Sequence, residues 1–131
     1  MKKAVCVLLA AACAGIFTAC GDSIDTSVSD TGTPDGKWEL VGGIRDGKEV
    51  KAGKKGWDES FDIDGTSGTY YVADDGQDGT FNVTFRQLDD NEYEIRMKDT
   101  IAIGTATVGS DKMVYESTLG SEHDKYVYKK V

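Results

Sequence analysis

The sequence predicts an all-β chain that folds as an eight-stranded antiparallel up-and-down barrel. The domain divides into eight runs of about seven to ten residues, and most of them alternate apolar and polar side chains with a period of two, which is typical of strands with one buried face. The 131 residues include 16 glycines and one proline, which indicates many tight turns. A flat eight-stranded meander would leave two open edges and an uncovered face, and closure into a barrel removes both. The same pattern permits a two-sheet sandwich, which is the alternative.

Each of the first three runs is followed by an Asp-Gly pair, a common hairpin turn. These runs are Lys37 to Arg45, Trp57 to Asp64 and Gly68 to Asp74. In the first, the even-numbered residues from Trp38 to Ile44 share the apolar face, and Arg45 lies on the polar face. In the second, the odd-numbered residues from Trp57 to Ile63 share the face that we expect to be buried.

Turn signals also separate the last five runs. These runs are Thr80 to Leu88, Glu92 to Lys98, Ile101 to Val108, Met113 to Leu119 and Lys125 to Val131. The plainest alternation is in the first of them, where Phe81, Val83 and Phe85 share one face. No segment of the domain has the pattern of a long amphipathic helix.

The N-terminus, residues 1–19, has the pattern of a secretory signal peptide. A positive start, Met1-Lys2-Lys3, precedes an uncharged and mostly apolar run of about 14 residues, Ala4 to Phe17, which is too short to span a membrane. The following Phe17-Thr18-Ala19-Cys20-Gly21 resembles the lipobox of bacterial lipoproteins. That resemblance implies cleavage before Cys20 and acylation of this cysteine, often with palmitate-like chains.

The lipobox resemblance also implies a location in the bacterial cell envelope. Cys6 and Cys13 lie in the leader, so Cys20 is the only cysteine of the processed chain, which then contains no internal disulfide. Gly21 differs from the aspartate that retains some lipoproteins in the inner membrane, so we expect the outer membrane in a Gram-negative cell and the cell membrane otherwise. After Cys20, residues 20–36 are rich in Ser, Thr, Asp and Gly and predict a flexible polar tether.

The two ends of the domain, residues 37–131, resemble small bacterial lipocalin-like domains. The start, Gly36-Lys37-Trp38-Glu39-Leu40-Val41, contains the Gly-x-Trp of that group, and the final Lys125 to Val131 is similar to its last strand. The resemblance implies that Trp38 closes the base of a barrel. Lipocalins place an arginine over this tryptophan, whereas this chain ends with Lys129 and Lys130.

Charge and motifs exclude several classes of function. Removing Lys2 and Lys3 leaves 13 basic against 23 acidic residues, a net charge of −10, which disfavours nucleic acid as a partner. The single histidine, His123, has no second ligand nearby, and Asp62-Ile63-Asp64-Gly65 lacks the remaining ligands of a calcium loop. No nucleophile motif or phosphate loop is present. We therefore expect no metal, no cofactor and no enzymatic activity.

The leading hypothesis for the function is a membrane-tethered binding module for a small apolar or anionic ligand. Its mouth would be lined by aromatic residues, namely Trp57, Phe61, Tyr71, Phe81, Phe85 and Tyr93. A lysine cluster in the loop after the first strand would act as a gate that attracts anions, namely Lys48, Lys51, Lys54 and Lys55. These aromatic residues would be ordinary core if the barrel is filled, and these lysines ordinary solvated side chains.

Two other functions stay open at this point. The acidic domain is suited to a basic protein partner, for example as an inhibitor of a basic envelope enzyme. A structural spacer without a ligand is the second alternative, because nothing in the sequence excludes a filled barrel.

Overall fold

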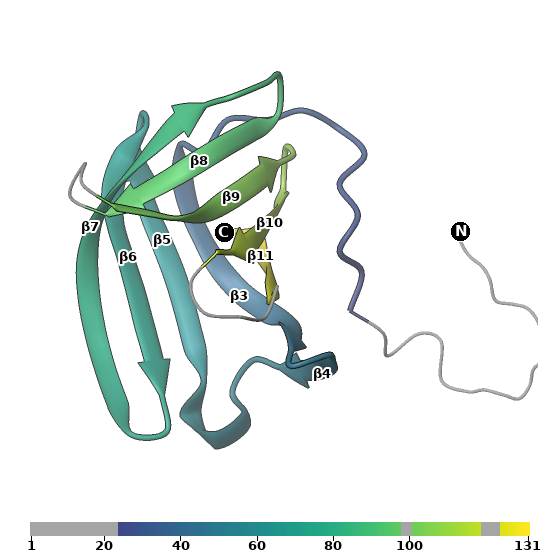
Figure 1. Cartoon of the computed structure of the whole chain (residues 1–131), viewed down its shortest axis with the longest axis vertical. Coiled ribbons are helices and arrows are strands. Elements are labelled where there is room, and N and C mark those ends of the chain that lie inside the picture. The colour runs from purple at the N-terminus through teal and green to yellow at the C-terminus, as the bar shows by residue number, and fades with distance from the viewer. Residues whose placement is uncertain (1–23, 98–100, 119–123) are drawn as a thin grey trace, which may run out of the picture.

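The computed structural model describes residues 24–97, 101–118 and 124–131, and shows a closed antiparallel barrel (Figure 1). Its eight strands follow the chain order: β3 (Gly36–Arg45), β5 (Asp58–Asp64), β6 (Ser67–Asp74), β7 (Gln77–Gln87), β8 (Glu92–Met97), β9 (Ile101–Val108), β10 (Lys112–Ser117) and β11 (Lys125–Lys130). Each strand pairs with the next, and β11 pairs with β3 to close the sheet. The predicted barrel is confirmed over the sandwich.

The eight predicted runs all form strands, but the sequence reasoning missed a ninth. Asp46-Gly47 does not end the pairing; both residues have positive φ, 52° and 76°, and turn the chain into the short strand β4 (Lys48–Lys51). The first half of β3 pairs with β5, whereas its second half pairs with β4. A 3₁₀ turn, η2 (Lys54–Gly56), then leads into β5. With Val50 as its single apolar residue, β4 has no alternation to predict it.

A β-bulge in β3 changes which residues face the interior. Leu40 pairs with Tyr128 and Gly42 with the adjacent Val127, so β3 carries one extra residue, Val41. The inward face therefore moves from even-numbered to odd-numbered positions. Arg45 points into the barrel, and its assignment to the polar outer face was wrong for this reason.

Trp38 is buried at the end of the barrel where β3 begins. This side chain is fully buried, and its indole Nε1 donates a 2.8 Å hydrogen bond to the carbonyl oxygen of Pro34, which is itself buried. The Lys130 ammonium lies 5.5 Å from the centroid of the Trp38 ring. Lys130 thus lies as a cation over the face of the tryptophan.

Residues 24–36, the N-terminal strap, differ from the free coil that their composition predicts. The strap runs along the outside of the barrel to the end where β3 begins (Figure 1). The Gly32 amide donates to the Val108 carbonyl oxygen at 3.0 Å, and the Asp30 carboxylate accepts bonds from the Ser110 hydroxyl and amide. Composition could not predict this because the contacts are mostly polar and involve the backbone.

The remaining predictions about the N-terminus lie outside the described residues. These are the signal peptide, residues 1–19, and the lipidation of Cys20. His123 and the final residues of two predicted runs, Lys98 and Leu119, are also outside them. Within the described part of the chain, no helix has the length and apolar character needed to span a membrane.

Candidate functional site

The end of the barrel opposite Trp38 contains an open cavity of about 540 Å³. At this end β3, β6, β8 and β10 finish and β5, β7, β9 and β11 begin. The lining combines apolar, aromatic and charged side chains: Arg45, Glu59, Tyr70, Val72, Asp74, Gln77, Asp78, Gly79, Phe81, Met97, Ile103, Tyr115, Ser117, Asp124 and Tyr126. The interior is therefore packed near Trp38 and hollow at the other end.

A buried carboxylate, Glu59, lies where the cavity meets the packed core. It is 4% exposed and accepts hydrogen bonds from the Trp57 Nε1 at 2.8 Å, the Tyr128 hydroxyl at 2.6 Å and the Tyr70 hydroxyl. The inward alternation of β5 places Glu59 between Trp57 and Phe61, because odd-numbered residues of this strand face the core. Three donors offset much of the cost of removing a carboxylate from water.

Tyrosine side chains form much of the wall around Glu59. Burial raises the pKa of Tyr70 far above its ordinary value, and the nearby Glu59 carboxylate raises it further. Burial likewise raises the pKa of Tyr115 and of Tyr126. The rings of Tyr70 and Tyr115 lie 6.1 Å apart between centroids, and those of Tyr115 and Tyr126 lie 5.6 Å apart. The wall is thus a set of neutral, protonated rings.

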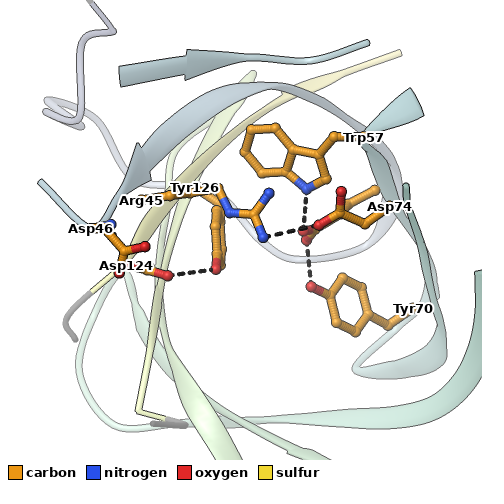
Figure 2. Close-up of polar contacts among 8 residues, drawn as sticks. Arg45, Asp46, Trp57, Tyr70, Asp74, Asp124 and Tyr126 are labelled. Atoms are coloured by element: carbon orange, nitrogen blue, oxygen red, sulfur yellow. Dashed lines mark hydrogen bonds and ion pairs between the residues drawn. The ribbon is translucent and has the colours of Figure 1, made fainter. Parts of the chain in front are cut away.

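Arg45 reaches into the cavity mouth from the end of β3 (Figure 2). Its guanidinium forms a 2.9 Å ion pair with Asp74 and lies 4.7 Å from the centroid of the Trp57 ring. On the adjacent side, Asp124 accepts a 3.2 Å hydrogen bond from the Tyr126 hydroxyl and another from the Asp46 amide. The mouth therefore contains one arginine among several carboxylates.

The predicted ligand-binding residues divide into three groups. Phe81 lines the cavity and is 37% exposed. Four others are buried in the hydrophobic core and do not line it: Trp57, Phe61, Phe85 and Tyr93. Tyr71 was wrongly assigned to the interior, because Tyr70 pairs with the inward Phe61 and Phe81, which turns the next residue outward.

The predicted lysine gate lies near this end of the barrel but outside the cavity. All four lysines are exposed, and none is among the described lining residues: Lys48, Lys51, Lys54 and Lys55. The η2 loop is tied to the β6–β7 turn by a 3.1 Å bond from the Asp75 amide to the Lys55 carbonyl oxygen. These four lysine side chains are therefore not part of the described lining of the cavity.

Sequence reasoning missed the most important polar residues of the site. Glu59 stands at an inward position between apolar neighbours, and this break in the alternation was a usable signal. Arg45 could be found only by locating the bulge, for which the adjacent Gly42 and Gly43 are the signal. A Cβ on Gly43 would collide with the carbonyl oxygen of Lys125.

The lining of the cavity combines hydrogen-bonding groups, charged groups and apolar side chains. Among the described residues, no group of three or more His, Cys, Asp or Glu side chains is arranged to hold a metal ion.

Comparisons with known proteins extend to the fold. A crystal structure of an uncharacterized protein from Bacteroides eggerthii DSM 20697 is similar to this chain, with a TM-score of 0.50 and 20% sequence identity. The similarity covers 74% of this chain and 98% of that chain. No protein-family model and no curated protein matches the sequence. At this identity the likeness supports a shared barrel fold alone.

Proposed function

We propose that this barrel is a binding module that takes one small molecule with an apolar body into its open end. The observation that carries the proposal is the cavity of about 540 Å³, which is within the usual size of small-molecule sites. A filled barrel would leave no such space. The spacer without a ligand is the less favoured alternative for that reason.

The walls support an amphiphilic ligand. Val72, Phe81, Met97 and Ile103 provide apolar contact, while Glu59 and the tyrosine hydroxyls provide polar contact at defined depths. This combination of mostly apolar walls and a few placed polar groups is typical of pockets that orient a small ligand. The expectation of an anionic ligand loses support, because the lysines on which it depended lie outside the lining.

A neutral dye that fluoresces in apolar surroundings, N-phenyl-1-naphthylamine, tests the proposal on the full-length protein. We expect one-to-one binding. Val72→Trp, which fills the cavity, should reduce affinity at least tenfold, and Met97→Trp is a second filling variant. The matched control is Thr80→Trp, because Thr80 pairs with the outward Tyr71 and is exposed. Equal binding by the filled and control variants, or no binding at all, would overturn the proposal.

We also propose that the module is a lipoprotein attached to the bacterial envelope through Cys20. The Ile24 amide donates a 3.1 Å hydrogen bond to Glu49 of β4, and a link of four residues reaches about 13 to 14 Å at most. An acylated Cys20 would thus hold the barrel close to the membrane surface. Two acyl chains are enough for stable attachment.

Metabolic labelling with a palmitate analogue in a bacterial host tests this attachment. We expect label on the wild-type protein and on Cys13→Ala, whose change lies in the leader. Cys20→Ala should carry no label and should leave the membrane fraction. Label that persists in Cys20→Ala would contradict the proposal.

The barrel as an inhibitor of a basic envelope enzyme is the remaining alternative. Its support is the net charge of −8 for the whole chain, which would steer a basic partner. Membership of the lipocalin-like group stays a prediction from the two ends of the domain.

A further inference from the structure

The charges and rings of the open cavity point to one class of ligand. We infer that the cavity selects a ligand whose polar end is a cationic amine or quaternary ammonium group, with the apolar body against the Val72 and Phe81 side. This inference rests on the proposed function, because it names the ligand class of the same cavity.

The first argument is the balance of charge in the described lining. Arg45 is neutralised by its ion pair with Asp74. The other carboxylates that line the cavity are Glu59, Asp78 and Asp124, and no described lysine or arginine forms an ion pair with them. Carboxylates grouped around one cavity attract a cation and repel an anion.

The second argument is the hydrogen bonding of the buried Glu59 side chain. The Trp57 indole can only donate, and it donates to Glu59 Oε2, while the two tyrosine hydroxyls reach Oε1. The two oxygens of a carboxylate have about four acceptor positions, and hydrogen bonds from the described residues account for three at Glu59. An ammonium group of a ligand in the cavity would supply a further donor.

The third argument is the aromatic wall. The rings of Tyr70, Tyr115 and Tyr126 are neighbours and line the cavity beside Glu59. Electron-rich faces of this kind attract cations, and groups of them bind quaternary ammonium compounds. Because burial holds the pKa of these tyrosines above the ordinary value, the rings stay protonated at neutral pH.

The fourth argument is that the mouth already accommodates a cation of the chain itself. The Arg45 guanidinium lies over the Trp57 ring and pairs with Asp74 within the mouth (Figure 2). Deeper in the cavity, Tyr70 and Glu59 again combine an aromatic ring with a carboxylate. Arg45 is therefore a competing charge at the entrance, and its removal should favour a cationic ligand.

Three amphiphiles that share a ten-carbon chain test the inference on the full-length protein. Decyltrimethylammonium, decanol and decyl sulfate are titrated below their aggregation concentrations, with calorimetry as the readout. We expect the ammonium compound to bind at least tenfold more tightly than decanol, and decyl sulfate to bind most weakly. The preference should decline with added salt.

Paired variants locate the effect in the cavity. Asp78→Asn removes an exposed lining carboxylate and should weaken ammonium binding several-fold, whereas Arg45→Gln should strengthen it several-fold. Glu59→Gln should weaken it most, with circular dichroism as the check that the barrel is intact. Lys48→Gln is the matched control, because it removes one exposed charge at this end without touching the lining, and we expect no change.

The outcomes separate this inference from the proposed function. Equal or tighter binding of decyl sulfate would overturn the inference while the binding module stands. Failure of all three compounds and of the neutral dye would overturn both. Effects of equal size and opposite sign in Asp78→Asn and Lys48→Gln would also contradict the inference, because the preference would then follow net charge and not the cavity.

Discussion

The two ends of the barrel satisfy their polar groups in different ways. At the closed end, the Trp38 indole donates a hydrogen bond to Pro34 of the strap, and Lys130 of the last strand lies over its ring. At the open end the rings stop short of filling the interior, and Glu59 is satisfied by three side chains of the barrel itself. From this comparison we expect stability to be concentrated at the closed end, with the cavity at the other end available to the proposed ligand.

The largest expected effect comes from removing the closure. Trp38→Ala deletes a fully buried indole and should cost about 3 to 5 kcal/mol of unfolding free energy, measured by denaturant titration. The matched change at the open end is Phe81→Ala, which removes a ring that is 37% exposed and should cost about 1 kcal/mol or less. Equal losses would break the proposed division between the two ends.

A second prediction concerns the loss of stability at alkaline pH through the tyrosines around Glu59. Burial raises the pKa of Tyr128 well above its ordinary value, and Tyr70 and Glu59 nearby raise it further. Because the folded state holds this proton more tightly than the unfolded state, the contribution to stability is complete below pH 10. It is lost as the pH rises toward the folded-state pKa, at about 1.4 kcal/mol per pH unit for each such tyrosine.

The Tyr128→Phe variant tests this assignment. It removes one ionisable group from the Glu59 cluster, so its unfolding free energy should fall less steeply above pH 10 than that of the wild type. Denaturant titrations at a series of alkaline pH values measure the two slopes. Parallel curves would show that the alkaline loss arises from groups other than Tyr128.

The sequence predicted the barrel because each strand buries one face, and period-two alternation records that burial directly. It did not predict the cavity residues equally well, because they depend on pairing. The bulge at Val41 turns Arg45 inward. Of the adjacent Tyr70 and Tyr71, only the pairing of Tyr70 with Phe61 shows which one faces the interior. The attachment of the strap to the barrel was not predicted, because hydrogen bonds such as that from Gly32 to Val108 leave no apolar pattern in the sequence.

The smallest expected effect concerns the strap, and it is local. Bonds from the Ser110 hydroxyl and then from its amide lower the pKa of Asp30 in the attached strap. The pKa of Asp25 is lowered to about 2, mainly by bonds from Ser27 of the strap itself, and only the smaller contribution of Lys112 depends on attachment to the barrel. A carboxyl whose pKa is lower in the attached state stabilises that state above pH 4. This contribution is lost as the pH falls toward 2.

We therefore expect the strap to detach from the barrel on acidification and in Asp30→Asn at neutral pH. Hydrogen exchange of the Gly32 amide, which donates to Val108, should accelerate several-fold in this variant while amides of β5 and β6 stay protected. Asp89→Asn is the control, because Asp89 lies in a hairpin turn and its carboxylate accepts only from the next amide among the described residues. If Gly32 exchanges equally slowly in both variants, Asp30 does not hold the strap, and the Pro34 carbonyl bond to Trp38 becomes the attachment to test next.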